Sequence, residues 1–374
     1  MDKQRVGVIG GGQLAWMMAM TTKKLGIDLL IQTPHEDDPA VAIADEVIFA
    51  AIDDPQATEK LAQKSDVITF ENEFIDLDAL KKLENNSVCF RPKLSALSPL
   101  LDKYQQRSYL QSITIPVPKF TTLEKLSLND FGFPLVIKAR RHGYDGQGTF
   151  IINNEKELSD LSSSKVNSLM VEEYVDFERE LAIMAARSTT GEIATYSLVE
   201  TYQKDQVCHW VVAPANVSET IQLEAKKIAE KLLTELDVVG IFGIELFLTS
   251  EEKLLVNEIA PRTHNSGHYT LDACDISQFE MQLRAVTGQP LGSTKLKALG
   301  AVMVNLLGYE NSHDDYQEKR NKLAQIPHTY VHWYGKKECR PGRKLGHVTS
   351  LIKHSNINPE TIAKQIESIW YPQL

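Results

Sequence analysis

At 374 residues the chain is too long for one ordinary hydrophobic core, so two or three domains are expected. A net charge of −10 argues against general nucleic-acid binding, although a local basic patch could still bind a small anionic substrate. No apolar run approaches the roughly 20 residues of a membrane span, and the start "MDKQRVGVIG" lacks the long apolar region of a secretory signal. The four cysteines are scattered without paired metal spacing, which favours reduced thiols and a cytoplasmic protein.

The chain begins with the pattern of a parallel βαβ unit: a buried strand, a glycine turn, an amphipathic helix and a second strand. Gly10, Gly12 and Ala15 match the G-x-G-x-x-G/A spacing that lets a ligand phosphate approach a helix N-terminus. A nicotinamide-dependent oxidoreductase would carry an acid at the end of the second strand, where this chain has Gln32. The oxidoreductase is therefore disfavoured, while phosphate binding and tight strand-to-helix packing remain equal alternatives.

Further strand and helix patterns follow, and we expect this first domain to end near residue 95. The segment "FENEF" places Glu71 and Glu73 at the carboxyl end of a strand, where open α/β sheets bind ligands. Glu73 could accept hydrogen bonds from sugar hydroxyls, or it could be an acid at a helix N-terminus. From Ser95, "SALSPLLDKYQQRSYLQSI" predicts a polar helix.

A glycine-rich hairpin is predicted next. The segment "PLVIKA" predicts a strand with Lys138 near its end, and "RRHGYDGQGTF" predicts a loop that returns into a second strand. Such a loop can lay backbone N–H groups over phosphates while the lysine neutralises their charge. An exposed hairpin tip is the less favoured alternative, because charged side chains gather around the glycines.

The segment "SLMVEEYV" predicts an apolar strand, "DFERE" a polar link, and the following residues another strand. The backbone of "EEYV" could hydrogen-bond an adenine edge, with Glu180 accepting from a ribose. Ordinary acids on an edge strand are the alternative. A strand pair and a long amphipathic helix capped by Ser218 complete this region.

Two short apolar strands between Gly240 and Ala260 each carry one carboxylate inside an apolar run. If this hairpin folds symmetrically about Glu251 and Glu252, Glu245 lies opposite Glu258 on the same face. Two half-buried carboxylates must share a proton or bind a cation, so a divalent metal with oxygen ligands is predicted. Asn257 and Arg262 add a neutral oxygen and a base, which suggests a nucleoside triphosphate site. Two ordinary surface acids are the alternative.

A smaller C-terminal domain begins with the strand pattern "GAVMVNLLG". Within it, "VHWYGKKECRPGRKLGHVTSL" gathers Lys336, Arg340, Arg343 and Lys344 about a Pro-Gly turn. Solvated surface charge is the usual explanation of such a run, but several bases around one turn can also bind one phosphate.

Together, "IGGGQLAWM", "FENEF", "YDGQG", "VNEIAPRTHNSGH", "SQFE" and "RPGRKLGHVT" resemble the ATP-grasp ligases over essentially the whole chain, and within them the carboxylases of purine biosynthesis. The resemblance implies a mixed α/β and α+β architecture with three domains. These are a Rossmann-like preATP-grasp domain over residues 1–95, a two-lobed ATP-grasp domain over residues 96–294, and a small C-terminal domain over residues 295–374.

The same resemblance implies site residues. Those for ATP are Lys103, Lys138, the lid Gly143, Tyr144, Asp145, Gly146, Gln147, Gly148 and Thr149, the adenine hinge Glu172, Glu173, Tyr174 and Val175, and Glu180, Gln203, Asn257 and Glu258. Mg2+ would be held by Glu245 and Glu258. The second substrate would contact Gln13, Glu73, Asp145, His268, Lys336 and Arg343, and the catalytic residues would be Asp145, Arg262 and Lys336. Gln147 stands where the family commonly has arginine, which puts any contact made by that arginine in doubt.

The implied reaction is the ATP-dependent carboxylation of 5-aminoimidazole ribonucleotide by bicarbonate. Carboxyphosphate forms first, and either it or CO2 released from it carboxylates the exocyclic amine. ATP and Mg2+ are the expected cofactors, and a homodimer that binds neither nucleic acid nor membrane is the expected state. A formate-dependent transformylase of the same pathway is the alternative enzyme, and a non-catalytic nucleotide-sensing module is disfavoured.

Overall fold

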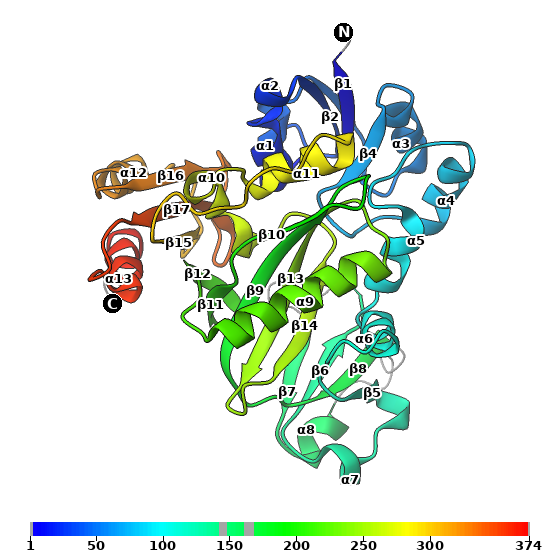
Figure 1. Cartoon of the computed structure of the whole chain (residues 1–374), viewed down its shortest axis with the longest axis vertical. Coiled ribbons are helices and arrows are strands. Elements are labelled where there is room, and N and C mark those ends of the chain that lie inside the picture. Colours follow the sequence, from blue (N-terminus) through cyan, green and yellow to red (C-terminus); the bar gives the residue numbers. More distant parts are fainter. Residues whose placement is uncertain (1–2, 142–147, 161–167, 373–374) are drawn as a thin grey trace.

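The computed structural model describes residues 3–141, 148–160 and 168–372. Three sheets organise these residues, and Figure 1 shows the N-terminal sheet at one end, a small lobe at the other, and a long sheet between them. No helix among the described residues is long and apolar enough to cross a membrane.

The N-terminal sheet is parallel, with strand order β3-β2-β1-β4, as the βαβ pattern predicts. Its strands are β1 (Gln4–Ile9), β2 (Ile27–Thr33), β3 (Glu46–Phe49) and β4 (Val67–Phe70). Its helices are α1 (Gln13–Ala19), α2 (Thr22–Leu25), the 3-10 turn η1 (Pro39–Ala42), α3 (Pro55–Ala62) and α4 (Leu77–Asn85). At the end of β2, the buried Gln32 amide donates to the carbonyls of Ala51 and Asp54 and accepts from Thr58, so it is fully engaged in packing.

The glycine turn before α1 is occupied by a carboxylate of the protein itself. Glu71 accepts hydrogen bonds from the backbone N–H groups of Gly12 at 2.7 Å and Leu14 at 3.0 Å. A Cβ at Gly10 would lie 2.4 Å from a Glu71 oxygen, and one at Gly12 would lie 2.6 Å away. Of the two alternatives for these glycines, the structure therefore favours packing, because Glu71 already satisfies the helix N-terminus that a phosphate would need.

We predict that Glu71→Ala lowers the free energy of unfolding by about 2–4 kcal/mol, because it leaves buried N–H groups unpaired. Exposed Glu59 on α3 is a suitable control, and Glu59→Ala should change stability by less than about 0.5 kcal/mol. Urea unfolding of both variants measures the difference. Equal midpoints would show that the carboxylate does not hold this turn.

The small lobe is an antiparallel sheet of order β5-β8-β6-β7. It comprises β5 (Phe120–Thr122), the turn η3 (Leu123–Lys125), α7 (Leu128–Phe131), β6 (Leu135–Ala139), β7 (Thr149–Ile152), α8 (Glu155–Ser159) and β8 (Leu169–Glu173). The single helix predicted after Ser95 is wrong. It is divided into α5 (Leu94–Leu97), η2 (Ser98–Leu100) and α6 (Lys103–Ser112), because Asp102 caps a new helix through the N–H groups of Tyr104 and Gln105.

The long sheet runs β14-β13-β9-β11-β12-β15-β17-β16, with β10 paired to β9. Its strands are β9 (Phe177–Arg187), β10 (Ile193–Thr195), β11 (Val199–Lys204), β12 (Val207–Ala213), β13 (Gly240–Thr249), β14 (Leu254–Ala260), β15 (Gly300–Leu307), β16 (Thr329–Trp333) and β17 (Lys344–Ile352). The polar link predicted at "DFERE" is wrong, since β9 begins at Phe177 and pairs along β13. The strands of the predicted C-terminal domain thus continue the ATP-grasp sheet through the β12–β15 pair.

Helix α9 (Glu219–Glu235) covers one face of this sheet, and Ser218 caps it by accepting from the Ile221 N–H. In Figure 1 the helix lies over β9 and β13. Other helices are α10 (Thr270–Ala273), α11 (Gln278–Thr287), α12 (Gln317–Ala324) and α13 (Pro359–Trp370), with the turn η5 (Asn265–Gly267). Leu246 and Leu248 belong to the core under α9, so the alternating side chains of β13, including Glu245, face the opposite side.

Candidate active site

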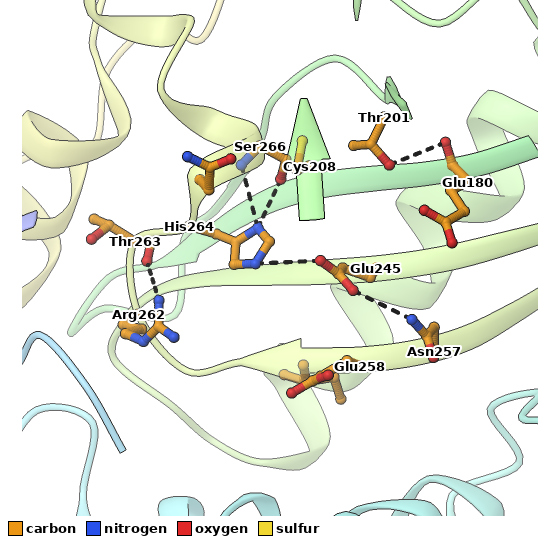
Figure 2. Close-up of polar contacts among 12 residues, drawn as sticks. Glu180, Thr201, Cys208, Glu245, Asn257, Glu258, Arg262, Thr263, His264 and Ser266 are labelled. Atoms are coloured by element: carbon orange, nitrogen blue, oxygen red, sulfur yellow. Dashed lines mark hydrogen bonds and ion pairs between the residues drawn. The ribbon is translucent and has the colours of Figure 1, made fainter. Parts of the chain in front are cut away.

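The hairpin β13–β14 brings the two predicted carboxylates together, since Glu245 pairs with Glu258. Near the turn the register differs from the predicted symmetry: Leu248 pairs with Leu254, which centres the turn on Glu251. A β-bulge beside Glu245 shifts the register and restores the carboxylate pair, leaving Asn257 as the extra residue. Figure 2 shows the side chains of Glu245, Asn257 and Glu258 gathered along these two strands.

The bulge directs Asn257 into the site. Its amide oxygen accepts a hydrogen bond from Lys138 at 3.0 Å, and its amide nitrogen donates to Glu245 at 3.4 Å. A bulge re-aims a side chain in this way. Two carboxylates and one neutral amide oxygen therefore converge from adjacent strands.

The pKa values of the two carboxylates are shifted in opposite directions. Burial and the neighbouring carboxylates of Glu258 and Glu180 raise the pKa of Glu245 to about 7. Burial also acts on Glu258, but the ammonium group of Lys103, 2.5 Å away, holds the pKa of Glu258 below its ordinary value. The pair is thus a site of unfavourable negative charge that a cation would stabilise.

The donor set fits Mg2+, which prefers hard oxygen ligands. Glu245 and Glu258 supply carboxylate oxygens, and their side chains keep 29% and 42% of their surface exposed, so an ion can reach both. Asn257 supplies a third oxygen beside them.

The two predicted phosphate lysines approach this pair from separate elements. Lys103 is the first residue of α6, and its ammonium contacts Glu258. Lys138 lies near the end of β6, where it contacts Asn257 and, at 2.7 Å, Glu172. Burial lowers the pKa of Lys138, while the Glu172 carboxylate opposes that shift. Two cations therefore border the carboxylate pair, as a nucleotide polyphosphate requires.

Glu172 has a different position from the one predicted for an adenine hinge. Its side chain is 3% exposed and bridges Arg107, at 2.5 Å, and Lys138. Although burial favours the neutral acid, Arg107 and Lys138 hold the pKa of Glu172 at about 2. Its backbone also lies inside the sheet, paired with β5 and β6. We therefore correct this prediction: the carboxylate of Glu172 orients Lys138, and its backbone is paired within the sheet.

The neighbouring hinge residues are more accessible. Glu173 ends β8, its N–H donates to the Lys119 carbonyl, and its carboxylate accepts from the Lys119 N–H. Tyr174 and Val175 follow beyond the last strand residue, and Tyr174 is 43% exposed. The backbone after β8 is thus the part of the predicted hinge placed to meet a base.

Glu180 and Gln203, both predicted near the nucleotide, are brought together across β9 and β11. Burial raises the pKa of Glu180 to about 7, and a hydrogen bond from Gln203 opposes that shift. Glu180 also contributes to the negative potential at Glu245, so the two residues belong to the same site.

Five of the predicted lid residues, Gly143, Tyr144, Asp145, Gly146 and Gln147, lie outside the described residues. Gly148 and Thr149 are described: the Gly148 carbonyl accepts from the Ala139 N–H, and Thr149 pairs with Lys138. The C-terminal end of the predicted lid therefore lies beside Lys138, on the strand next to it.

The residues predicted for the second substrate approach from both ends of the chain. Glu73 and Arg262 form an ion pair at 2.9 Å, and Gln13 is the first residue of α1 in the first domain. Burial and the positive charge of Arg343 lower the pKa of Lys336 to about 8, whereas Glu71 opposes that shift. Lys336 thus lies within the electrostatic reach of Glu71 and Asp38 of the first domain, whereas Arg340 is exposed.

The predicted contact of His268 with the second substrate needs correction. The ring is 1% exposed and contacts Gln278, Phe279 and His347, and burial lowers its pKa well below the ordinary value. Such an interior position gives it no surface for a substrate. His264 was not among the predicted site residues, yet it lies 3.4 Å from Glu245 and is drawn with it in Figure 2. Its place within "PRTHNSGH", four residues before His268, was the available indication.

These features define the class of protein: a carboxylate pair on β13 and β14, lysines from α6 and β6, and a preceding Rossmann-like sheet are those of an ATP-grasp enzyme. Family models agree. The ribonucleotide synthetase preATP-grasp domain matches residues 3–99, the ATP-grasp domain residues 108–279, and the phosphoribosylaminoimidazole carboxylase C-terminal domain residues 301–357.

Individual relatives narrow the class. The N5-carboxyaminoimidazole ribonucleotide synthase of Synechocystis is 56% identical over 380 residues, covering 98% of each chain. The crystal structure of the Thermotoga maritima synthetase matches with a TM-score of 0.86 and 40% identity, covering 97% of this chain and 96% of that one. The Aspergillus clavatus enzyme in complex with ADP and 5-aminoimidazole ribonucleotide matches with a TM-score of 0.90 and 30% identity, covering 98% of both. The chain belongs to the N5-carboxyaminoimidazole ribonucleotide synthase family, which confirms the predicted ATP-grasp fold and ligase class.

Proposed function

We propose that this protein carboxylates 5-aminoimidazole ribonucleotide with bicarbonate at the expense of ATP, in purine biosynthesis. The observation that carries the proposal is the junction at the end of β14, where the carboxylate pair and its lysines meet Arg262 and Glu73. A nucleotide bound at the pair would therefore present its terminal phosphate to a second substrate held between the first and last domains.

For the nucleotide, we assign Lys103 and Lys138 to the phosphates, Glu180 and Gln203 to the ribose, and the backbone after β8 to the base. Glu245, Glu258 and Asn257 would hold Mg2+. The ion supplies charge neutralisation to the phosphates when bound. Glu172 and Arg107 keep Lys138 extended toward Asn257, because the three side chains form one buried network.

The proposed reaction has two steps, and neither involves oxidation or reduction. A bicarbonate oxygen attacks the γ-phosphorus of ATP, the bond to ADP breaks, and carboxyphosphate forms. The exocyclic amine then bonds to the carboxyl carbon, supplied by carboxyphosphate or by CO2 released from it, while phosphate leaves and the amine loses a proton. Lys103 and Lys138 offset charge on the transferring group. Asp145 stays our candidate for holding the amine or moving its proton.

We place bicarbonate between Arg262 and His264. Both residues lie in the segment that follows β14, where Arg262 pairs with Glu73 and His264 lies beside Glu245. A cation and an imidazole there can bind an anion between the terminal phosphate and the ribonucleotide.

The ribonucleotide phosphate is assigned to Lys336 and Arg343, with Gln13 and Glu73 facing the rest of the molecule. The chain is further proposed to act as a homodimer in the cytoplasm. Analytical ultracentrifugation would measure whether the protein is a homodimer.

ADP release tests the proposed function. Turnover should require ATP, bicarbonate and 5-aminoimidazole ribonucleotide together, and omission of any one should abolish carboxylated product. Formate with glycinamide ribonucleotide should give no ADP. Turnover with that second pair would instead identify a transformylase.

The pH dependence of substrate binding tests the role of Lys336. With a pKa of about 8, the side chain loses its charge as the pH rises, so the KM for the ribonucleotide should increase about tenfold between about pH 7 and pH 9. Lys336→Arg should remove this dependence, because arginine remains protonated. An equal pH dependence of the KM for ATP, or a variant that keeps the slope, would contradict the assignment.

A further inference from the structure

A buried polar chain lies under the proposed ribonucleotide-phosphate site. Asp272 on α10 accepts from or shares a proton with Nε2 of His332 on β16, at 2.8 Å. The His332 ring stacks on the ring of His347 on β17, with centroids 4.5 Å apart. Nδ1 of His347 lies 2.8 Å from the Tyr334 hydroxyl. His347 is 0% and Tyr334 3% exposed, so the Tyr334–His347 end of this chain is buried, while Asp272 and His332 are partly exposed.

Tyr334 occupies the point where both proposed ribonucleotide-binding elements meet. Its ring lies edge-on to Trp16 of α1 at 6.1 Å, one turn after Gln13. The ammonium of Lys336 lies 5.7 Å from the same ring, within the range of a cation–π contact. One aromatic ring thus contacts both α1 of the first domain and Lys336 of the basic patch.

A metal ion is a poor explanation of the cluster. Asp272, His332 and His347 each offer a ligand atom, and these atoms lie within 4.8 Å of one another. However, the two imidazole planes are stacked at 15°, and in-plane lone pairs of stacked rings do not converge on one ion. Asp272 and His332 already satisfy each other directly.

We propose that Tyr334 and His347 are positioning residues for the ribonucleotide: their hydrogen bond fixes the Tyr334 ring, and the ring fixes Lys336 against α1. This inference rests on the proposed function and extends its substrate site. Burial lowers the pKa of His347 well below its ordinary value, so the imidazole stays neutral and the link acts through hydrogen bonding rather than charge.

Tyr334→Phe removes the hydroxyl and keeps the ring. The KM and the calorimetric Kd for 5-aminoimidazole ribonucleotide should rise about tenfold, while kcat and the KM for ATP stay within about twofold. Tyr196→Phe is the matched control: that hydroxyl is also buried and donates to the Ile276 carbonyl at 3.0 Å. The control should share any loss of thermal stability but keep the wild-type affinity for the ribonucleotide.

A rescue experiment separates positioning from packing. His347→Asn can keep a hydrogen-bonding amide near the place of Nδ1 and should retain most of the affinity, whereas His347→Leu should lose as much as Tyr334→Phe. Unchanged ribonucleotide affinity in Tyr334→Phe, or equal losses in the asparagine and leucine variants, would overturn the inference. So would a stoichiometric transition metal found by mass spectrometry and lost in Asp272→Asn. Wild-type protein that binds the ribonucleotide without carboxylating it would refute the proposed function alone; absence of binding would refute both.

Discussion

Glu258→Gln should reduce ATP-dependent carboxylation by on the order of a thousandfold while the protein remains folded. Loss of one carboxylate removes charge from the proposed Mg2+ site and leaves Lys103 without its partner at 2.5 Å, effects that together amount to about 4 kcal/mol in the barrier. The rate of carboxylated product formation at saturating substrates measures the loss.

Glu251→Gln is the control for this variant, because Glu251 lies in the turn of the same hairpin and pairs only with exposed Lys253 among the described contacts. Its activity should equal that of the wild type. Wild-type turnover in a folded Glu258→Gln protein would remove the metal assignment, whereas loss of activity in both variants would point to damage of the hairpin instead.

Glu172→Gln should destabilise the small lobe by about 3 kcal/mol, because it leaves Arg107 and Lys138 buried without their shared carboxylate. Lys138 should then be displaced, raising the KM for ATP. Glu173→Gln, at the next position but on the surface, should cost less than about 1 kcal/mol. Chemical unfolding of the pair measures the contrast.

The difference in unfolding free energy between wild type and Glu172→Gln should decrease at acid pH. The pKa of Glu172 falls from 4.5 to about 2 on folding, so its contribution is complete above about pH 4.5. It should disappear as the pH falls toward about 2. A stability gap between wild type and Glu172→Gln that is constant from neutral to acid pH would contradict the ion-pair assignment.

The local sequence pattern was sufficient to predict contacts between residues that are near one another in the sequence. The β13–β14 hairpin is an example: alternation and one turn predicted the pairing of Glu245 with Glu258. The symmetric turn was nevertheless wrong. A one-residue bulge at Asn257 changes the register, and its side chain accepts a hydrogen bond from Lys138 of another lobe, a contact that no periodicity within the hairpin records.

Two of the acids singled out in the sequence have partners that are distant along the chain. Glu172, predicted in the adenine hinge, is 65 residues from Arg107, and Glu71, predicted at the ligand-binding end of its strand, is 59 residues from Gly12. Charge alone cannot distinguish a ligand-binding carboxylate from one that is paired internally. The continuation of the ATP-grasp sheet into β15 and β17 was likewise hidden, because an edge strand and a central strand can share the same apolar pattern.

Isotope transfer tests the central claim most directly. Wild-type protein supplied with ATP, 18O-labelled bicarbonate and 5-aminoimidazole ribonucleotide should release phosphate that carries one oxygen from bicarbonate, in amounts equal to ADP and to carboxylated product. This follows because the bond between that oxygen and phosphorus forms in carboxyphosphate and survives its breakdown. Phosphate that carries only oxygen from water, formed with ADP but without carboxylated product, would contradict the account.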